Sequence, residues 1–174
     1  MYLISIYFDE KTNKILQRYI DRIAEKSGNY FMIENKVPPH MTIASIEARN
    51  VNVLKPAFED LNGKLCAGNM KVVSIGQLFP YVLYATPVMN QKLFDLSGEI
   101  YKAFCDIPET MLSEYYKPFS WLPHITLGKT LDKVQMQKAF QTMQEKFIPF
   151  TARFGEIGLA KVNPHEDVAK FTLL

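Results

Sequence analysis

A short pattern of proline, histidine, apolar residue, threonine and apolar residue occurs twice in this chain, and it constrains the fold more than any other feature. It reads PHMTI at 39–43 and PHITL at 123–127, which places His40 and His124 84 residues apart. Such alternation of apolar and polar residues predicts a strand with one buried face. A predicted helix and then a pair of predicted strands follow each copy. The chain is therefore expected to fold as two similar halves.

The duplication is too regular to be accidental. The sequence contains three histidines, and two of them stand in this pattern. Given how often threonine and apolar residues occur in this chain, two matches by chance have a probability below about one in a thousand. The third histidine, His165, is followed by Glu166 and Asp167 and is predicted to be a solvated turn residue. A single copy would be typical of a histidine in the core, whereas two copies favour a shared function.

Hydrophobic periodicity divides the chain into a mixed series of helices and strands. Strands are predicted at 2–8, 40–47, 70–79, 81–88, 124–129, 150–162 and 168–174, with a short one at 29–34. Amphipathic helices are predicted at 11–26, 51–61 and 91–105, and from Asp132 to about residue 147. The segment 106–120 is predicted to be an irregular loop rich in aromatic residues, and the sequence NPHED to be a turn between the last two strands.

Length and composition predict one globular domain, residues 1–174, built of two lobes. A chain of 174 residues with 48% hydrophobic and 22% charged residues can bury a sizeable core. The net charge of +2 argues against duplex DNA or a membrane surface as a partner, but suits a small nucleotide or an RNA end. Cys66 and Cys105 stand alone, which predicts two buried, inert thiols and favours a reducing cytoplasm. The apolar run at 2–8 has no basic segment before it and is followed at once by Asp9 and Glu10, which favours a first strand over a signal peptide. No apolar run is long enough for a membrane span, and a cytoplasmic monomer is expected.

The two motifs provide the groups that metal-free phosphoryl chemistry requires. On a strand, His40 and Thr42 share one face, and the apolar residues that alternate with them point to the core. The same holds for His124 and Thr126. Two imidazoles on opposite sides of a phosphate can act as base and acid near neutral pH, and threonine hydroxyls can stabilise its non-bridging oxygens. The sequence has no HxH, HExxH or CxxC spacing and no P-loop, so neither a metal nor another cofactor is expected.

These residues resemble the signature of the two-histidine (2H) phosphoesterases, which include the 2′-5′ RNA ligase-like proteins and the cyclic phosphodiesterases. That signature is two His-x-Thr-apolar motifs roughly half a chain apart, here HMTI and HITL. The resemblance implies an α+β fold with two lobes of antiparallel sheet, outer helices and pseudo-twofold symmetry around a central cleft. It also implies metal-independent hydrolysis, or reversible transesterification, of a 2′,3′-cyclic phosphate or a 2′-5′ linkage. By the same resemblance, the active-site residues are His40, Thr42, His124 and Thr126.

Other residues near the motifs are weaker candidates for substrate binding. Many ligase-like members have an arginine shortly after the second motif, where this chain has Lys129. Lys129 can meet phosphate as a point charge, although strict strand alternation directs it away from the face of the second histidine. Trp121 and Tyr115 are candidates for stacking on a nucleobase at the cleft mouth, with packing of their loop over the core as the favoured alternative. Phe79 and Tyr81 pose the same choice.

Hydrolysis by a cyclic phosphodiesterase-like enzyme is the first hypothesis, and two others stay open. A non-catalytic binding module would keep the cleft and hold a phosphorylated nucleotide or RNA end without turnover. A 2′-5′ RNA ligase would join ends on the same site, and would need a longer RNA surface than the charge of +2 suggests. The pseudo-symmetry also leaves open which histidine is the base and which is the acid.

Overall fold

The strands form an antiparallel sheet that curves round until its ends meet. The computed structural model describes residues 1–162 and 165–174, and within them eight strands belong to one sheet. These are β1 (Tyr2–Phe8), β2 (His40–Ala48), β3 (Gly68–Leu78), β4 (Val82–Pro87), β5 (Thr110–Leu112), β6 (Ile125–Gly128), β7 (Phe150–Lys161) and β8 (Glu166–Thr172). Their order is β1-β2-β6-β4-β3-β7-β8, β5 adds to β2, and β7 also pairs with β1.

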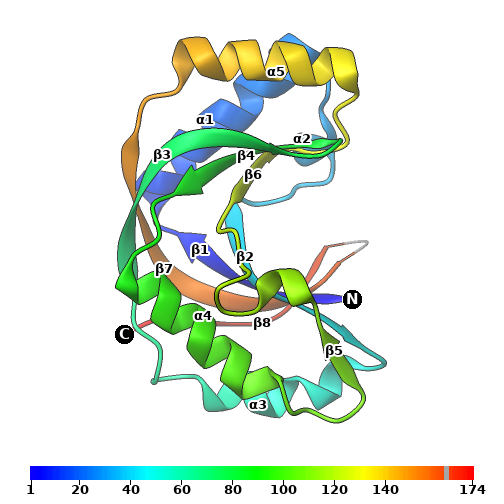
Figure 1. Ribbon diagram of the computed structural model, residues 1–174, viewed down its shortest axis with the longest axis vertical. Helices are drawn as coiled ribbons and strands as arrows, with labels where there is room; N and C mark the ends of the chain where they lie inside the picture. The colour runs from blue at the N-terminus through cyan, green and yellow to red at the C-terminus, as the bar shows by residue number, and fades with distance from the viewer. Residues whose placement is uncertain (163–164) are drawn as a thin grey trace.

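The long strand β7 divides the sheet into two lobes (Figure 1). Its first part, up to Phe154, pairs with β3 in the upper lobe of the figure. Its second part pairs with β1 on one side and with β8 on the other, in the lower lobe. The lobes meet a second time where β2 of the lower lobe pairs with β6 of the upper lobe. The predicted α+β fold with antiparallel sheet is thus confirmed.

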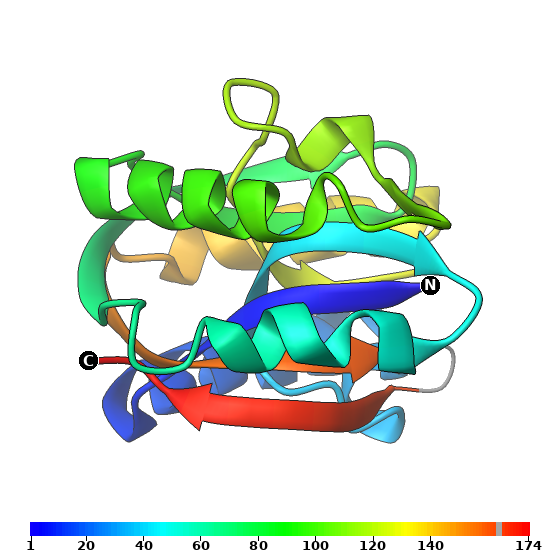
Figure 2. The same ribbon diagram turned by 90° about the horizontal axis from the view of Figure 1, so that it is seen from below.

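Helices cover the two ends of the molecule. They are α1 (Glu10–Ser27), α2 (Phe31–Glu34), α3 (Lys55–Asp60), α4 (Gln91–Phe104) and α5 (Lys133–Lys146), with short 3₁₀ turns at Val51–Val53 and Glu114–Tyr116. Helices α1 and α5 lie together at the upper end in Figure 1, and α3 and α4 lie at the lower end. Figure 2, seen from below, shows α3 and α4 beside the strands of the lower lobe.

Side-chain caps determine where the longer helices begin. Asp9, Asn90 and Asp132 each accept a hydrogen bond from the backbone N–H three residues later, at 2.8–3.0 Å. Such caps satisfy donors that a helix start would otherwise leave unpaired, and each is worth about 1 kcal/mol. Helix α1 ends at Gly28, whose φ of 76° is left-handed and therefore suits glycine.

Two helices cross from one lobe to the other. Helix α1 follows β1 of the lower lobe but packs against β6 and α5 of the upper lobe. Helix α4 follows β4 of the upper lobe but packs against β2 of the lower lobe. Each motif strand is therefore backed by a helix that comes from the other half of the chain, which holds the two halves together.

One hydrophobic core runs through the molecule and includes the apolar residues of both motifs. Met41 and Ile43 of β2 and Ile125 and Leu127 of β6 are each at most 1% exposed. Full burial of such a side chain contributes about 1.5–3 kcal/mol to stability. The alternation of the motifs thus predicted correctly which residues enter the core.

Three predicted segments differ from the structure. Residues 31–34 form a helical turn instead of a strand, because the Asn29 side chain accepts a hydrogen bond from the Phe31 N–H and starts the turn. The helix predicted at 51–61 is divided at Leu54, and Pro56 lies in the first turn of α3, where a missing N–H has no cost. The predicted loop 106–120 contains strand β5. Residues 163 and 164 of the predicted NPHED turn lie outside the described residues.

The predicted burial of the two cysteines is wrong, because both are exposed. Cys105 directly follows α4, and Cys66 lies in the connection before β3, so neither belongs to the buried face of a helix or strand.

Candidate active site

The two histidine motifs lie side by side where the lobes meet. Met41 of β2 is paired with Ile125 of β6 in antiparallel register. Antiparallel register continued from this pair places His40 opposite Thr126, and Thr42 opposite His124. The imidazole of each motif therefore faces the hydroxyl of the other, around a local twofold axis between Met41 and Ile125.

The backbone orients both imidazoles in the same way. Nδ1 of His40 lies 2.8 Å from the carbonyl oxygen of Pro38, and Nδ1 of His124 lies 2.8 Å from that of Leu122. A carbonyl oxygen accepts and never donates, so Nδ1 carries the proton in each ring. The neutral imidazole then has its lone pair on Nε2. Each motif thus presents a nitrogen that can take up a proton.

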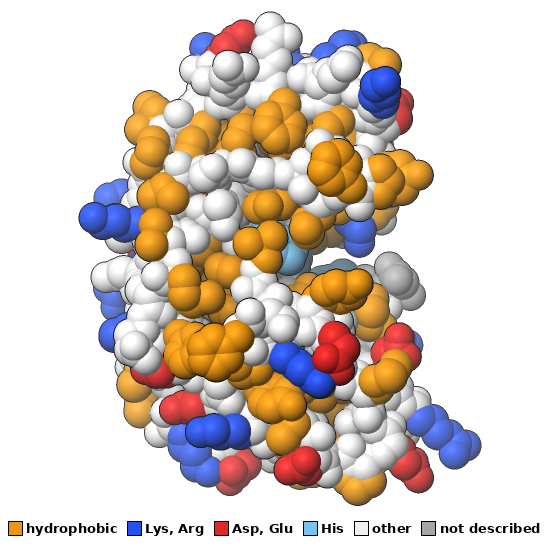
Figure 3. Space-filling view, viewed as in Figure 1, with side chains coloured by type: hydrophobic (Ala, Val, Ile, Leu, Met, Phe, Trp, Pro, Cys, Tyr) orange, Lys and Arg blue, Asp and Glu red, His pale blue; other side chains and the backbone are white. Residues whose placement is uncertain are grey.

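The histidines are half-buried in a hollow between the lobes. Figure 3 shows a histidine in this hollow, with hydrophobic side chains around it. Burial lowers the pKa of His40 below its usual value against the opposing hydrogen bond to Pro38, and the positive charges of His165, His124 and Lys129 lower it further. Burial likewise lowers the pKa of His124. Both rings therefore favour the neutral form more than a solvated histidine does.

A buried tyrosine accompanies each histidine. The ring of Tyr7 on β1 lies 6.3 Å from that of His40, and the ring of Tyr84 on β4 lies 5.5 Å from that of His124. Both tyrosines are at most 9% exposed. Sequence reasoning missed these two tyrosines because each has the pattern of an ordinary apolar strand residue. Which histidine each tyrosine contacts depends on the pairing of the strands.

Each tyrosine ring occupies the space beside a glycine of the neighbouring strand. A Cβ atom on Gly76 of β3 would overlap the ring of Tyr84, and one on Gly158 of β7 would come within 2.8 Å of the ring of Tyr7. The glycines therefore leave room for the tyrosines, and the tyrosines support the histidines. This arrangement repeats in both lobes.

The threonines differ in their surroundings. The hydroxyl of Thr42 is buried and lies 3.3 Å from the Ser5 hydroxyl. Thr126 is half-buried. A threonine hydroxyl at either place can donate to a non-bridging phosphate oxygen. Ser5, which pairs with Thr42 across β1 and β2, is a further site residue that sequence reasoning missed.

The candidate substrate-binding residues take different positions. Trp121 is 7% exposed and donates a hydrogen bond from its indole nitrogen to the carbonyl of Thr42, which favours a structural role. Tyr115, in contrast, is 81% exposed and can meet a ligand. Phe79 and Tyr81 flank Pro80 at the tip of the β3–β4 hairpin and are also exposed. These four side chains remain predictions as ligand contacts.

Strand alternation does not determine the direction of the Lys129 side chain. Strand β6 ends at Gly128, so the alternation no longer applies to the next residue. The Lys129 ammonium lies 5.7 Å from the centre of the Phe31 ring, and its charge reaches His40. It can therefore add positive charge where a phosphate would bind.

His165 lies in a turn, as predicted, but its side chain is half-buried instead of solvated. Its ring stacks on that of His40, with the centres 6.4 Å apart, and its side chain is 23% exposed. Its Nε2 atom lies 3.2 Å from Oδ1 of Asp167. No local sequence pattern predicts this contact, because it depends on strand pairing. Strand β8 pairs with β7, and β7 pairs with β1, so the segment before β8 comes close to the first motif.

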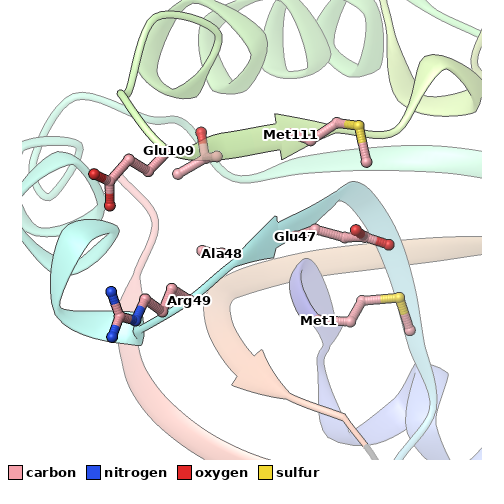
Figure 4. Close-up of a pocket in the computed structure, with 7 residues that line it drawn as sticks. Met1, Glu47, Ala48, Arg49, Glu109 and Met111 are labelled. Atoms are coloured by element: carbon pink, nitrogen blue, oxygen red, sulfur yellow. The ribbon is translucent and has the colours of Figure 1, made fainter.

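Other cavities lie away from the histidines. An open pocket of about 480 Å³ is lined by Met1, Glu47, Arg49, Glu109 and Met111, among others, where β2 meets β5 (Figure 4). It lies at the end of β2, whereas His40 begins that strand, about 25 Å away along the chain at the usual strand rise. Within the described ranges, no three His, Cys, Asp or Glu side chains form a group that could hold a metal ion.

Comparison with known proteins identifies the family of this chain. Residues 12–166 match the family described as the 2′-5′ RNA ligase superfamily. The chain belongs to this superfamily. It is thus a relative of the two-histidine phosphoesterases, as the motifs predicted.

Solved structures show how far the superfamily's fold extends along this chain. A solved phosphoesterase is 14% identical to this chain, with a TM-score of 0.67. LigT of E. coli is 13% identical, also with a TM-score of 0.67. Each match covers 99% of this chain and 97% of the solved chain. TT0787 of Thermus thermophilus is 14% identical with a TM-score of 0.65, over 99% of this chain and 97% of its own. No curated protein matches the sequence. At these identities the likeness establishes the fold over the full length. Among the described residues, no helix is long and apolar enough to cross a membrane.

Proposed function

We propose that this chain is a metal-independent phosphodiesterase that hydrolyses a 2′,3′-cyclic phosphate or a 2′-5′ phosphodiester of RNA or of a nucleotide. One observation carries the proposal. His40 and His124 each have Nδ1 bound to a backbone carbonyl, which leaves Nε2 for proton transfer, on two strands that pair beside each other. Two such rings can act from opposite sides of one phosphorus atom.

The reaction divides between the two imidazoles. One takes a proton from the attacking water, whose oxygen forms a bond to phosphorus. The other, which must start protonated on Nε2, donates that proton to the ribose oxygen as the bond from this oxygen to phosphorus breaks. The hydroxyls of Thr42 and Thr126 donate to the non-bridging oxygens, where negative charge grows. Lys129 adds a positive charge near the same place.

Ligands of a solved relative support a nucleotide-sized substrate. LigT of E. coli has been solved with 3′-AMP, with NADP⁺ and with ATP. Those are nucleotides bound to a protein of this fold, and they favour a nucleotide or an RNA end as the ligand here. The exposed Tyr115 is the candidate for stacking on its base.

The test is hydrolysis of a panel of 2′,3′-cyclic nucleotides and short 2′-5′-linked RNAs in excess EDTA. The wild-type protein, His40→Ala and His124→Ala are compared, with Glu166→Gln as a control that changes an exposed charge outside the site. We expect turnover of at least one panel member, lost in both alanine variants and kept in the control. Saturable binding without turnover by the wild type would support the binding module instead, and joining of RNA ends would support the ligase.

A further inference from the structure

A third histidine contacts the first motif, although it belongs to neither copy. The ring of His165 stacks on that of His40 at an angle of 28°, with the centres 6.4 Å apart. His165 directly precedes β8, and its side chain is 23% exposed. The described end of the β7–β8 connection thus lies against the candidate active site.

The carboxylate of Asp167 contacts both His165 and Tyr7, the two residues whose rings lie beside that of His40. Oδ1 of Asp167 lies 3.2 Å from Nε2 of His165 and accepts a hydrogen bond of 3.4 Å from the Tyr7 hydroxyl. Oδ2 of Asp167 lies 2.8 Å from the ammonium of Lys170, which also lies 4.0 Å from the centre of the Tyr7 ring. Partial burial raises the pKa of Asp167, but Lys170 and His165 outweigh it, so the carboxyl pKa lies below its usual range.

The surroundings of the two motif histidines therefore differ. The His40 ring lies 6.3 Å from that of Tyr7 and 6.4 Å from that of His165, and both of those side chains contact Asp167. In the part of the chain that the structure describes, the ring that contacts His124 is Tyr84. The backbone of the two motifs is alike, but only the first carries this Asp167-centred group.

We propose that His165, held by Asp167, is a positioning residue for His40. It restrains the His40 ring and, when protonated, places a positive charge beside it. This proposal rests on the proposed function, in which His40 exchanges a proton during the reaction. A positive neighbour favours the neutral form of His40, which is the form that can take the proton of the attacking water, and this leaves His124, in its protonated form, to protonate the leaving oxygen.

The charged or titratable groups that act on His40 are His165, His124 and Lys129, and the ring of Tyr7 lies beside it. Asp167, Lys170 and Glu156 act on these neighbours: Asp167 and Glu156 on Tyr7, and Lys170 on Asp167. Among them, His165 is the group whose ring stacks on that of His40. A substitution at His165 should therefore act on His40 more strongly than on His124.

The test is an NMR titration of the free protein. The chain has three histidines, so their three Cε1–H signals can be assigned with single substitutions. His165→Ala removes the charge and the ring that excludes water, whereas His165→Phe removes the charge and keeps a ring. We expect the His40 midpoint to move to higher pH in both variants, and further in His165→Ala. The His124 midpoint should move less in each.

Glu166→Gln is the matched control, because Glu166 is the next residue, is exposed and alternates with Asp167 along β8. It should leave the His40 midpoint at the wild-type value. An unchanged His40 midpoint in His165→Ala would overturn the proposal, and so would an equal shift in Glu166→Gln.

Kinetics provide a second readout. If the enzyme turns over a panel substrate, the acidic limb of the kcat/KM profile should move to higher pH in His165→Ala, with KM nearly unchanged. A fall in activity that is equal at every pH would contradict the positioning role. Lack of turnover by the wild type would contradict the proposed function alone, because the NMR titration would still decide the role of His165.

Discussion

The indole N–H of Trp121 donates a hydrogen bond of 3.2 Å to the backbone carbonyl of Thr42. This bond joins the approach to the second motif directly to the first motif. On the other side, the Thr86 hydroxyl donates to the carbonyl of Pro123 at 2.8 Å. Both contacts fix the segment that precedes His124, so the relative position of the two imidazoles depends on side chains outside the motifs.

Trp121→Phe should therefore lower stability. The substitution removes the donor for a buried carbonyl, which costs about 1–2 kcal/mol. A urea denaturation curve measures the change. Leu122→Ala, which alters an exposed neighbour, should stay within about 0.5 kcal/mol of the wild type. Equal midpoints for Trp121→Phe and the wild type would show that the bond does not hold the motifs together.

Gly76→Ala should disturb the support of His124. The new methyl group would overlap the Tyr84 ring, and overpacking of this kind costs about 1–3 kcal/mol. Gly155→Ala is the matched control, because a Cβ atom on that β7 glycine meets nothing within 4 Å. We expect a lower urea midpoint and lower turnover for Gly76→Ala only. If both variants behaved alike, the contact between Tyr84 and Gly76 would not matter for the site.

Thr126→Val should lower kcat with little change in KM. Valine keeps the shape of threonine but cannot donate to a non-bridging oxygen, and the loss of one such donor costs about a hundredfold in rate. Steady-state kinetics on the substrate found in the panel measure it. Thr151→Val, on an exposed position of β7, should retain wild-type kcat. A wild-type kcat in Thr126→Val would remove the hydroxyl from the mechanism.

Stability should decrease as the pH falls below about 6.5, the usual histidine pKa. Burial lowers the pKa of His40 and of His124 in the folded protein. The unfolded chain therefore binds more protons than the folded chain just below that pH, and acid favours unfolding. Urea midpoints at about pH 8 and about pH 5.5 measure the effect. The double variant His40→Gln, His124→Gln should show a smaller dependence on pH. An equal dependence in both proteins would mean that other groups cause it.

The sequence predicted the parts of the fold that depend on local pattern. Alternation around Met41 and Ile125 identified the buried faces of β2 and β6, and the periodicity of residues 11–26 identified α1. The short segment at 31–34 was predicted wrongly because its apolar residues fit a strand, while the Asn29 side chain starts a helical turn.

Contacts between distant segments were outside the reach of sequence patterns. His165 follows a proline and precedes two acidic residues, which reads as a turn, yet strand pairing brings it to His40. Tyr7 and Tyr84 read as core residues, and their place beside the histidines follows from which strands become neighbours. The two motifs were recognisable because each places its histidine and threonine within three residues, and the same pattern occurs twice in the chain.

The most direct test of the account is kcat/KM of the wild type, His40→Ala, His124→Ala and the double variant on one substrate, in excess EDTA. Each single variant should lose about a hundredfold or more, because each removes one partner of the acid–base pair. The double variant should lose little beyond the worse single variant, since the two residues act as a unit. A single variant that kept activity within about threefold of the wild type would contradict two-histidine catalysis.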